Sequence, residues 1–501
     1  MNVLMIMTDQ QRWDSLGVTG AQGYATPNLD RLAGEGALFE ACYCDNPVCT
    51  PSRASLFTGK PLPDHGVYRL HDILPEDETP FPYMLKQAGY KTALFGKWHL
   101  SGRVEEEKRR HPKDGFDIYE WCMEASVSLE SPLNGYGRWL EKQNPAFYIK
   151  LLKEGRNLGA MPLEYSFTRW AADRTISFLD DMSFSENDAT PWFCLMSVFD
   201  PHNPYDDAPL GYRDRVEKVA PAVPDSALTE TDIPGIRAEL DYSYLGTSSN
   251  LSEEDTRNMR RGYAASLILL DDEVGRVLDT LEKNGQTENT LVIFTSDHGD
   301  MLGDHGLYVK GAFFYDPCVR VPLIVRLPGV LKGGTRIAKP VQLRDLAMTV
   351  MTAAGAPELL IGKTGVDSRD LVSLAHGKSS ARSHVICRYR NSGINDRGNY
   401  WDPPILGDMI RRDDWKLNRY QGDSSAAKSS SQIQLFNLAE DPLELTNMAA
   451  DFETADIRRE LTEILLEEWA REDMYQGSRG GDARPREDQK ISNFQRTSAK
   501  K

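Results

Sequence analysis

The chain begins with Asn2-Val3-Leu4-Met5-Ile6-Met7-Thr8-Asp9, an almost unbroken apolar run that ends in an acid. Runs of this length and composition are typical of strands that are covered on both faces, as in parallel sheets. Four later stretches have the same character: residues 92–95, 193–199, 290–295 and 322–326. The sequence therefore predicts at least five buried strands, of which the first lies at the very start of the chain.

Helical stretches separate these strands. Thr26-Pro27 caps and opens a helix that continues to about residue 33, and residues 81–88 form a helix that stops at Gly89. Residues 166–179 precede the third strand, and a long helix from about residue 253 ends at Asn284-Gly285. Strands that alternate with helices indicate an α/β fold, with a large, mixed, mostly parallel sheet sandwiched by helices.

We predict three regions along the chain. Residues 1–378 form the catalytic α/β domain, and residues 379–475 form a smaller C-terminal α+β subdomain with short antiparallel strands and one helix. Residues 476–501 form a polar tail. Within the first region, residues 101–163 and 203–252 show no clear periodicity. We expect both to be long loops with a functional role.

Composition excludes several classes of protein. The 501 residues contain 58 Lys and Arg against 75 Asp and Glu, a net charge of −17 that argues against nucleic acid as a partner. No run reaches the ~18 apolar residues of a membrane span, so no membrane partner is expected. Seven scattered cysteines do not form a disulfide pattern, and no signal peptide precedes the first strand. We expect a cytoplasmic protein, although a trimmed exported chain would look the same.

Chemically active side chains follow four of the predicted strands. These strand ends read Thr8-Asp9-Gln10, Gly96-Lys97-Trp98-His99, Asp200-Pro201-His202 and Ser296-Asp297-His298. In open α/β sheets, ligands bind outside the carboxyl ends of the strands. The four sets of carboxylates, imidazoles and ammonium groups are therefore predicted to meet at one site.

A fifth segment carries a candidate nucleophile. In the stretch from Pro47 to Gly59, Pro51 suits a first helical turn and Gly59 suits the helix stop, which places Cys49 at a helix N-terminus. There the helix dipole and free N–H groups favour negative charge. Taken alone, the segment is equally typical of a short capped helix with a packed cysteine.

The pentapeptide Cys49-Thr50-Pro51-Ser52-Arg53 resembles the Cys-x-Pro-Ser-Arg signature of the type I, formylglycine-dependent sulfatases, which belong to the alkaline-phosphatase-like superfamily. The resemblance extends in family order from residue 2 to about residue 445. Besides the strand ends above, it includes Thr26-Pro27-Asn28-Leu29-Asp30, His305-Gly306-Leu307-Tyr308-Val309-Lys310, Leu435-Phe436-Asn437-Leu438 and Glu440-Asp441-Pro442.

This resemblance implies a sulfuric ester hydrolase with a modified nucleophile. In the family, a formylglycine-generating (sulfatase-maturating) enzyme oxidises the motif cysteine, here Cys49, to formylglycine, whose aldehyde hydrates to a geminal diol. One hydroxyl attacks sulfur and expels the alcohol. The second hydroxyl then loses its proton, and the aldehyde re-forms as sulfate leaves.

The resemblance also implies one divalent cation. Asp9, Asp297 and His298 match family ligand positions, together with the formylglycine oxygen from Cys49, and Gln10 either offers its carbonyl oxygen as a further ligand or points elsewhere. Because these ligands are mostly hard oxygens, we expect Ca²⁺. Many family members have two successive Asp where this chain has Asp9-Gln10. Some have Asn at the position of His298, and an imidazole ligand makes Mn²⁺ the second choice.

The remaining catalytic roles follow from charge. Arg53 is expected to fix the formylglycine oxygen and the neighbouring carboxylates with its planar fork. Lys97 and Lys310 are expected to neutralise the sulfate oxygens. His99 is the candidate base for elimination, and His202, together with Lys310, is the candidate acid for the leaving alkoxide.

Two other functions compete with the sulfatase interpretation. One is a phosphonate or phosphate ester hydrolase on the same scaffold, which the Lys97-x-His99 pair disfavours. The other is a non-catalytic binding or transport module, which would need a broken nucleophile or metal set. For the substrate we expect a small-molecule or oligosaccharide sulfate ester, a sugar sulfate rather than an aryl sulfate. Arg69, Arg103 and Arg390 are candidates for a second anionic group, and a homo-oligomer is left open.

Overall fold

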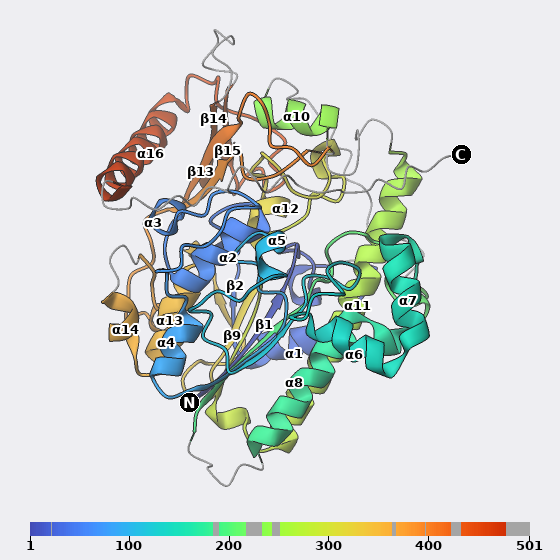
Figure 1. Ribbon diagram of the computed structural model, residues 1–501. Helices are drawn as coiled ribbons and strands as arrows, with labels where there is room; N and C mark the ends of the chain where they lie inside the picture. The colour runs from blue at the N-terminus through green and yellow to red at the C-terminus, as the bar shows by residue number, and fades with distance from the viewer. Residues whose placement is uncertain are drawn as a thin grey trace.

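The computed structural model describes residues 1–476 apart from Gln22, Asp396 and the segments 184–189, 217–232, 243–250, 363–366 and 422–431 (Figure 1). Helices cover both faces of a large central sheet, and a second, antiparallel sheet with one long helix packs at one end of this sandwich. The predicted α/β fold class, with a smaller C-terminal α+β part, is confirmed.

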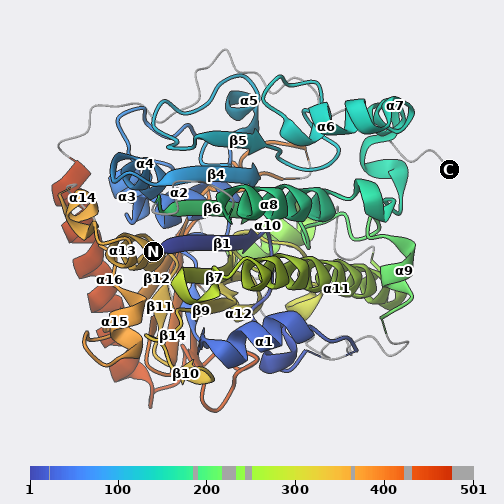
Figure 2. The same cartoon turned by 90° about the horizontal axis from the view of Figure 1, so that it is seen from below.

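The main sheet has the strand order β10-β2-β9-β7-β1-β6-β4-β5, which Figure 2 shows from one edge to the other. β1 lies inside the sheet and pairs in parallel with both β6 and β7, whereas β9 runs antiparallel to its neighbours. All five predicted strands are present in it. The strands are β1 (Asn2–Thr8), β2 (Ala37–Phe39), β4 (Lys91–Gly96), β5 (Ile118–Trp121), β6 (Trp192–Ser197), β7 (Thr290–Ser296), β9 (Leu323–Arg326) and β10 (Thr335–Ile337).

Each face of the main sheet has its own hydrophobic core. Along β1, Val3, Met5 and Met7 point into one core, and Leu4 and Ile6 point into the other, as the two-residue period of a strand requires. The second core lies beneath α1 (Pro27–Glu35), α8 (Phe167–Ser183) and α11 (Glu253–Lys283). The first lies beneath α2 (Cys49–Thr58), α4 (Phe81–Gln87) and α13 (Asp345–Ala353). β1 is therefore buried on both sides, which explains its continuous apolar sequence.

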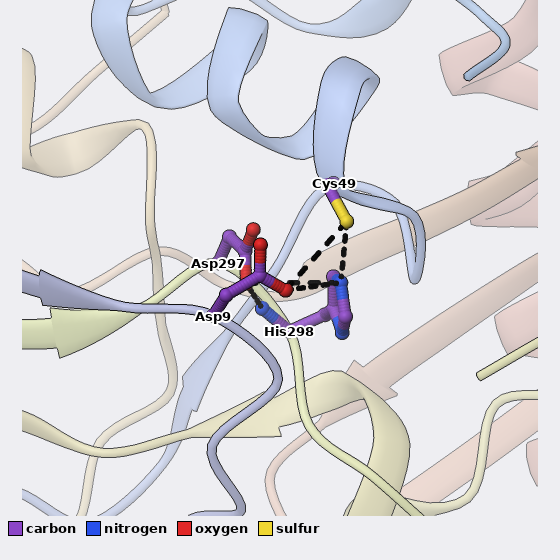
Figure 3. A group of neighbouring side chains, drawn as sticks. All are labelled: Asp9, Cys49, Asp297 and His298. Carbon is purple, nitrogen blue, oxygen red and sulfur yellow. Dashed lines mark hydrogen bonds and ion pairs between the residues drawn. The ribbon is translucent and has the colours of Figure 1, made fainter. Parts of the chain in front are cut away.

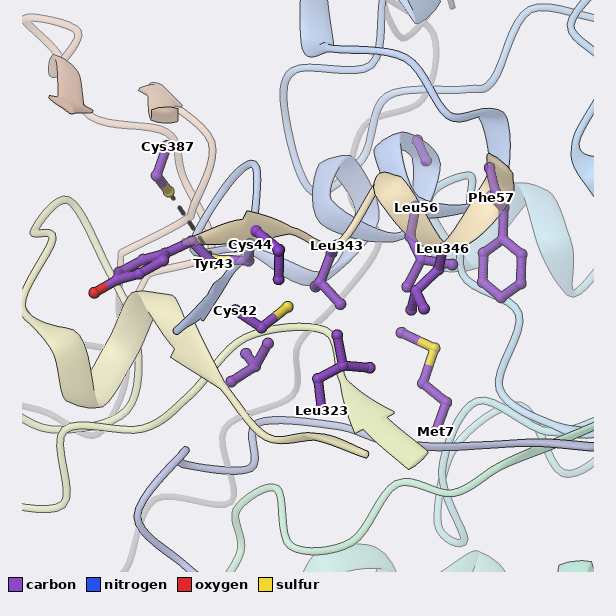
Figure 4. Close-up of a cluster of buried hydrophobic side chains, with 14 of the residues drawn as sticks. Met7, Cys42, Tyr43, Cys44, Leu56, Phe57, Leu323, Leu343, Leu346 and Cys387 are labelled. Carbon is purple, nitrogen blue, oxygen red and sulfur yellow. Dashed lines mark hydrogen bonds between the residues drawn. The ribbon is translucent and has the colours of Figure 1, made fainter. Parts of the chain in front are cut away.

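Helix α2, which carries the candidate nucleophile, is fully buried along its length. Its inner side chains Leu56 and Phe57 pack with Met7 of β1, and Leu343 and Leu346 close the cluster (Figure 4). A small sheet beside this cluster consists of β3 (Cys42–Tyr43), β8 (Arg320–Val321) and β11 (Val341–Gln342). Close packing thus holds the C-terminal half of α2 against the same strand that delivers Asp9.

The C-terminal sheet is an antiparallel meander of β12 (Val385–Arg390), β13 (Leu406–Arg412), β14 (Trp415–Gln421) and β15 (Ile433–Asn437). The long helix α16 (Ala455–Gln476) covers it through Leu461 and Leu465. On the opposite side, the buried ammonium of Lys416 lies 2.7 Å from Asp316 and 2.8 Å from Glu444. The predicted boundaries at residues 378 and 475 stay predictions, and residues 477–501 of the predicted tail lie outside the described part.

The prediction that residues 101–163 form a long loop is wrong. This stretch contains α5 (Arg103–Glu106), the edge strand β5, α6 (Gly135–Gln143) and α7 (Pro145–Glu154). β5 has only four residues, three of them half-buried, so it lacks the apolar run of the central strands. In the second predicted loop, α9 (Leu210–Arg213) and α10 (Pro234–Tyr242) are described, and parts of residues 203–252 lie outside the described residues. The other short helices are α3 (Leu62–His65), α12 (Asp316–Val319), α14 (Pro357–Ile361) and α15 (Leu371–Ala375).

Two further findings concern the whole described chain. None of its helices combines the length and the apolar character that crossing a membrane requires. All seven cysteines are buried free thiols.

Candidate active site

Four strand ends of the main sheet and the N-terminus of α2 converge on one buried cluster. Asp9, Cys49, Asp297 and His298 offer ligand atoms that all lie within 4.8 Å of one another (Figure 3). Asp9 follows β1, and Asp297 and His298 follow β7, its parallel neighbour in the sheet. The prediction that these strand ends meet therefore holds for residues that lie almost 290 positions apart in the sequence.

The arrangement of the cluster suits a divalent cation. Oδ1 of Asp9 lies 3.7 Å from both the Cys49 Sγ and the His298 Nε2, and Oδ1 of Asp297 lies 3.7 Å from the same imidazole nitrogen. His298 donates its Nδ1–H to the carbonyl of Gly299 at 2.9 Å, which leaves Nε2 free to act as a ligand. Two carboxylates, one imidazole and the side chain of residue 49 form a donor set that fits Ca²⁺ or Mn²⁺.

Arg53 fixes the outer oxygens of both carboxylates. Its Nε donates to Oδ2 of Asp297 at 2.7 Å, and its Nη2 lies 3.5 Å from Oδ2 of Asp9. Its Nη1 donates to the Lys97 carbonyl and to Ser197 Oγ, so the guanidinium contacts the ends of all four strands. The predicted contact with the carboxylates is thus present. The predicted contact with an oxygen on residue 49 stays a prediction.

Cys49 is the first residue of α2, and cations surround its sulfur. The Lys310 ammonium donates to Sγ at 3.1 Å, and His298 Nε2 lies 3.2 Å away. Burial and Asp9 alone would raise the pKa of this thiol, but Lys310, Lys97 and His298 together lower it below its usual value. Burial raises the pKa of each of the other six cysteines. Cys49 therefore has the most accessible thiolate form in the chain.

His99 is held as a neutral imidazole with one free nitrogen. The Thr50 hydroxyl donates to the Leu70 carbonyl at 2.8 Å, so it accepts the Nε2–H of His99 at 3.0 Å. Nδ1 of His99 is buried and has no hydrogen-bond partner among the described residues. Burial and the charges of Lys97 and Arg53 hold the pKa of His99 well below its usual value. An unprotonated ring nitrogen without a partner is what a general base needs.

His202 and Lys310 form a hydrogen-bonded pair. His202 donates its Nδ1–H to the Asn203 carbonyl at 2.7 Å, and its Nε2 accepts from the Lys310 ammonium at 2.9 Å. Lys310 also donates to the side-chain oxygen of Gln10 at 2.9 Å, and the Gln10 amide nitrogen donates to Asp300 at 2.7 Å. Gln10 is thus engaged by Lys310, and its role as a metal ligand stays a prediction.

Lys97 lies directly on the metal cluster. Its ammonium donates to Oδ2 of Asp9, the oxygen that Arg53 also contacts. Burial alone would raise the pKa of Asp9, but Lys97 and the neighbouring cations hold that pKa well below its usual value. The carboxylate of Asp9 is therefore ionised at neutral pH and available to a cation.

Sequence reasoning missed Glu106, a buried acid of α5. Its Oε2 accepts the backbone N–H of His99 and the indole N–H of Trp121, both at 2.9 Å. Its Oε1 accepts the backbone N–H groups of Leu100 at 2.8 Å and Ser101 at 3.2 Å. Glu106 therefore fixes the loop that carries His99. In the sequence it is one of three consecutive glutamates, a pattern typical of a solvated helix face.

A pocket opens above the cluster and reaches Cys49, Lys97, His99, His202 and Lys310. Of the three arginines predicted to receive a second anion, only Arg103 lines it. Arg69 bonds Asp72 at 3.2 Å and stacks on Tyr400, and Arg390 bonds Asp408 at 2.6 Å. The other lining residues include Val48, Leu70, Met123, Glu124, Glu239 and Ile394.

Comparisons with known proteins agree on one family. The family profile described as Sulfatase matches residues 1–356, and the one described as N-sulphoglucosamine sulphohydrolase, C-terminal matches residues 303–471. The choline-sulfatase of Rhizobium meliloti is 31% identical over 89% of this chain and 82% of its own length. The N-acetylglucosamine-6-O-sulfatase of Bacteroides thetaiotaomicron is 26% identical over 93% of this chain and 86% of its own.

A solved structure with the same fold is the phosphonate monoester hydrolase of Agrobacterium radiobacter. It aligns with a TM-score of 0.74 over 94% of this chain and 96% of its own, at 23% identity. At this identity the likeness concerns the fold alone.

The cluster makes a direct prediction about metal binding. Ca²⁺ added to the purified protein should bind at one site and raise the melting temperature, because a ligand that binds only the folded state stabilises it. Asp297→Asn removes one carboxylate charge from the cluster and should weaken Ca²⁺ binding by at least ~10-fold. Even the loss of a residue that only supports a metal ligand costs about that much. Isothermal titration calorimetry measures this change.

Asp279→Asn is the matched control, because Asp279 lies on the surface, where it pairs with Arg31. It should bind Ca²⁺ like the unmodified chain. Equal affinities for Asp297→Asn and Asp279→Asn would contradict the proposed ligand set.

Proposed function

Because the chain belongs to the sulfatase family and is therefore a sulfuric ester hydrolase, we propose that Cys49 is oxidised to formylglycine and acts as the nucleophile. The observation that carries the proposal is the contact of Cys49 with the Asp9, Asp297 and His298 cluster. Its lowered thiol pKa and its place in the Cys-x-Pro-Ser-Arg motif support it. The proposal requires a formylglycine-generating enzyme as a partner in the cell.

We propose that Ca²⁺, with Mn²⁺ as second choice, is held by Asp9, Asp297, His298 and the modified residue 49, with Gln10 as a further candidate ligand. When bound, such a cation would lower the pKa of a neighbouring hydroxyl and attract the sulfate oxygens. Lys310 donates to residue 49 and Lys97 to the neighbouring Asp9, so both ammonium groups are available to the sulfate oxygens at this nucleophile. Fixed charges in a buried site stabilise the transition state without reorganisation.

Two histidines handle protons in this proposal. Nδ1 of His99 is unprotonated and has no partner among the described residues, so it accepts the hydroxyl proton that starts the elimination of sulfate. Nε2 of His202 accepts a hydrogen bond from the Lys310 ammonium, so the proton that the pair gives to the leaving alkoxide originates on Lys310 and leaves it as a neutral amine. Base and acid thus have different hydrogen-bond environments, as the two roles require.

The substrate is proposed to be a sulfate monoester of a sugar or of another small alcohol. Two relatives that match most of the chain, an N-acetylglucosamine-6-O-sulfatase and a choline-sulfatase, support this range. A cytoplasmic location and a homo-oligomer stay predictions.

The modification of Cys49 has a direct test. After co-expression with a formylglycine-generating enzyme, the peptide that contains residue 49 should carry an aldehyde that reacts with a hydrazine probe, as mass spectrometry can detect. Cys49→Ala should lose the aldehyde and all turnover. Cys387→Ala removes a buried thiol outside the cluster and should keep both. Full activity of a protein that carries only the unmodified thiol would contradict the proposal.

Phosphonate ester hydrolysis is the alternative function on this fold. A sulfate ester and a phosphonate ester with the same leaving group distinguish it from sulfate ester hydrolysis. 4-Nitrophenyl sulfate should give a higher kcat/KM than 4-nitrophenyl phenylphosphonate. Elimination that re-forms the aldehyde expels sulfate dianion readily, and the Lys97-x-His99 pair serves this step. Steady-state kinetics on one enzyme preparation measure the ratio. A higher kcat/KM for the phosphonate would favour the alternative function.

Glu106 makes a prediction about pH. Burial raises the pKa of Glu106 to about 7, and only the carboxylate can accept the four N–H groups that hold the His99 loop. The kcat should therefore fall as pH decreases through about 7. Glu106→Gln directs an NH₂ group at N–H donors and so displaces the His99 loop. It should lower kcat by ~10- to 100-fold, as expected when a catalytic group is misplaced. The variant should also lose the fall of kcat at acidic pH, the acid limb of the pH profile.

Glu105→Gln is the control for the same helix, because Glu105 pairs with Arg109. It should keep both kcat and the acid limb. An unchanged pH profile in Glu106→Gln would show that another group titrates.

A further inference from the structure

The active-site pocket is lined by charged side chains of both signs. Cys49, Lys97 and Lys310 lie where the sulfate group is proposed to bind. The other lining residues include several apolar side chains and two acids, Glu124 and Glu239. Acids in the wall of this pocket bear on which alcohol the enzyme accepts.

The fold holds Glu239 close to the catalytic residues. Helix α10 packs so tightly that a Cβ on Gly235 would lie 1.7 Å from the Ala312 carbonyl oxygen, and Ile236 is fully buried. A Cβ on Gly311 would lie 2.2 Å from Oε1 of Glu239. The carboxylate thus rests against the backbone that directly follows Lys310. A glycine at position 311 makes this approach sterically feasible.

Glu239 is a buried acid without a cationic partner. The residue is 6% exposed, and within the described part of the chain it forms no ion pair. Burial raises the pKa of Glu239 well above its usual value, and the Ala312 backbone N–H only partly offsets this effect. Burying an unpaired carboxylate is costly. A cation supplied by the ligand would remove this cost.

Two other titratable residues of the pocket wall, Arg103 and His71, do not supply that cation. Arg103 lies 3.6 Å from Glu107 on its own helix, and its side chain is 35% exposed. Burial and nearby arginines lower the pKa of His71 to about 4, so this imidazole is neutral at pH 7. Within the described part of the chain, no cation of the pocket wall therefore forms an ion pair with Glu239.

We propose that the substrate is a zwitterionic sulfate ester, whose alcohol carries an ammonium group bound by Glu239. This inference rests on the proposed sulfate ester hydrolysis and narrows its substrate class. The apolar side chains of Val48, Leu70 and Met123 suit the carbon atoms around such a group. The net charge of −17 on the protein repels polyanionic esters, whereas a zwitterionic ester has no net charge and is not repelled in this way. The ammonium group belongs either to a small amino alcohol or to an amino sugar.

Two matched pairs of esters test the proposal and distinguish these sources. Choline sulfate pairs with 3,3-dimethylbutyl sulfate, its uncharged isostere, and glucosamine 6-sulfate pairs with glucose 6-sulfate. In at least one pair, the cationic ester should have a kcat/KM at least ~10-fold higher, the effect of about 1.4 kcal/mol. The pair that shows this preference identifies the source.

Glu239→Gln should reduce that preference to about one, mainly through a higher KM for the cationic ester. Glu254→Gln, a substitution on the exposed start of α11, should leave the preference unchanged. An equal loss for both members of a pair in Glu239→Gln would overturn the inference. The inference is also wrong if the enzyme hydrolyses 4-nitrophenyl sulfate but prefers the neutral ester in both pairs. In that case the proposed function, sulfate ester hydrolysis, still stands. If protein with a verified aldehyde and bound Ca²⁺ cleaves no sulfate ester at all, the proposed function itself fails.

Discussion

The buried guanidinium of Arg53 is the interaction on which the site depends. It is fully buried, and it bonds Asp297, Ser197 and the Lys97 backbone while lying within 3.5 Å of Asp9. It therefore joins the carboxyl ends of four strands to the helix that carries Cys49. Removing one member of such a buried ion group leaves the others uncompensated, at a cost of roughly 3–5 kcal/mol. Helix α2 must hold Arg53 in place, and Leu56 and Phe57, one turn further along the same face of the helix, anchor it by packing into the core (Figure 4).

The same interaction sets the electrostatics of the pocket. Arg53 occupies one oxygen of each carboxylate, so only the inner oxygens of Asp9 and Asp297 face the cluster. Lys97 and Lys310 add two further positive charges next to Asp9 and Cys49. The site thus attracts an anion locally, although the whole chain carries a net charge of −17. A binding site of this kind selects by short-range contacts rather than by long-range steering, because the surrounding field has the opposite sign.

The sequence predicted the parts of this site that have strong local signals. The apolar run before Asp9 and the motif around Cys49 placed both residues correctly, because buried strands and helix starts have characteristic compositions. It failed between residues 101 and 163, where the edge strand β5 is short and half-buried. It also missed Glu106 and Glu239. The importance of these acids arises from burial and from contacts with Trp121 and Ala312, which no pattern along the chain reveals.

The loop after β4 illustrates how much of the geometry depends on such contacts. Gly96 has a φ of 114°, and a Cβ there would lie 2.0 Å from the Ser197 carbonyl oxygen, so only glycine fits. His99 has a φ of 60°, a conformation that is unfavourable for a residue with a Cβ. It persists because Glu106 accepts the N–H groups of His99 and of the two residues that follow it. The strained backbone turns the imidazole toward Thr50, which in turn leaves Nδ1 free. The proposed base is thus oriented by Glu106, an acid that does not line the pocket.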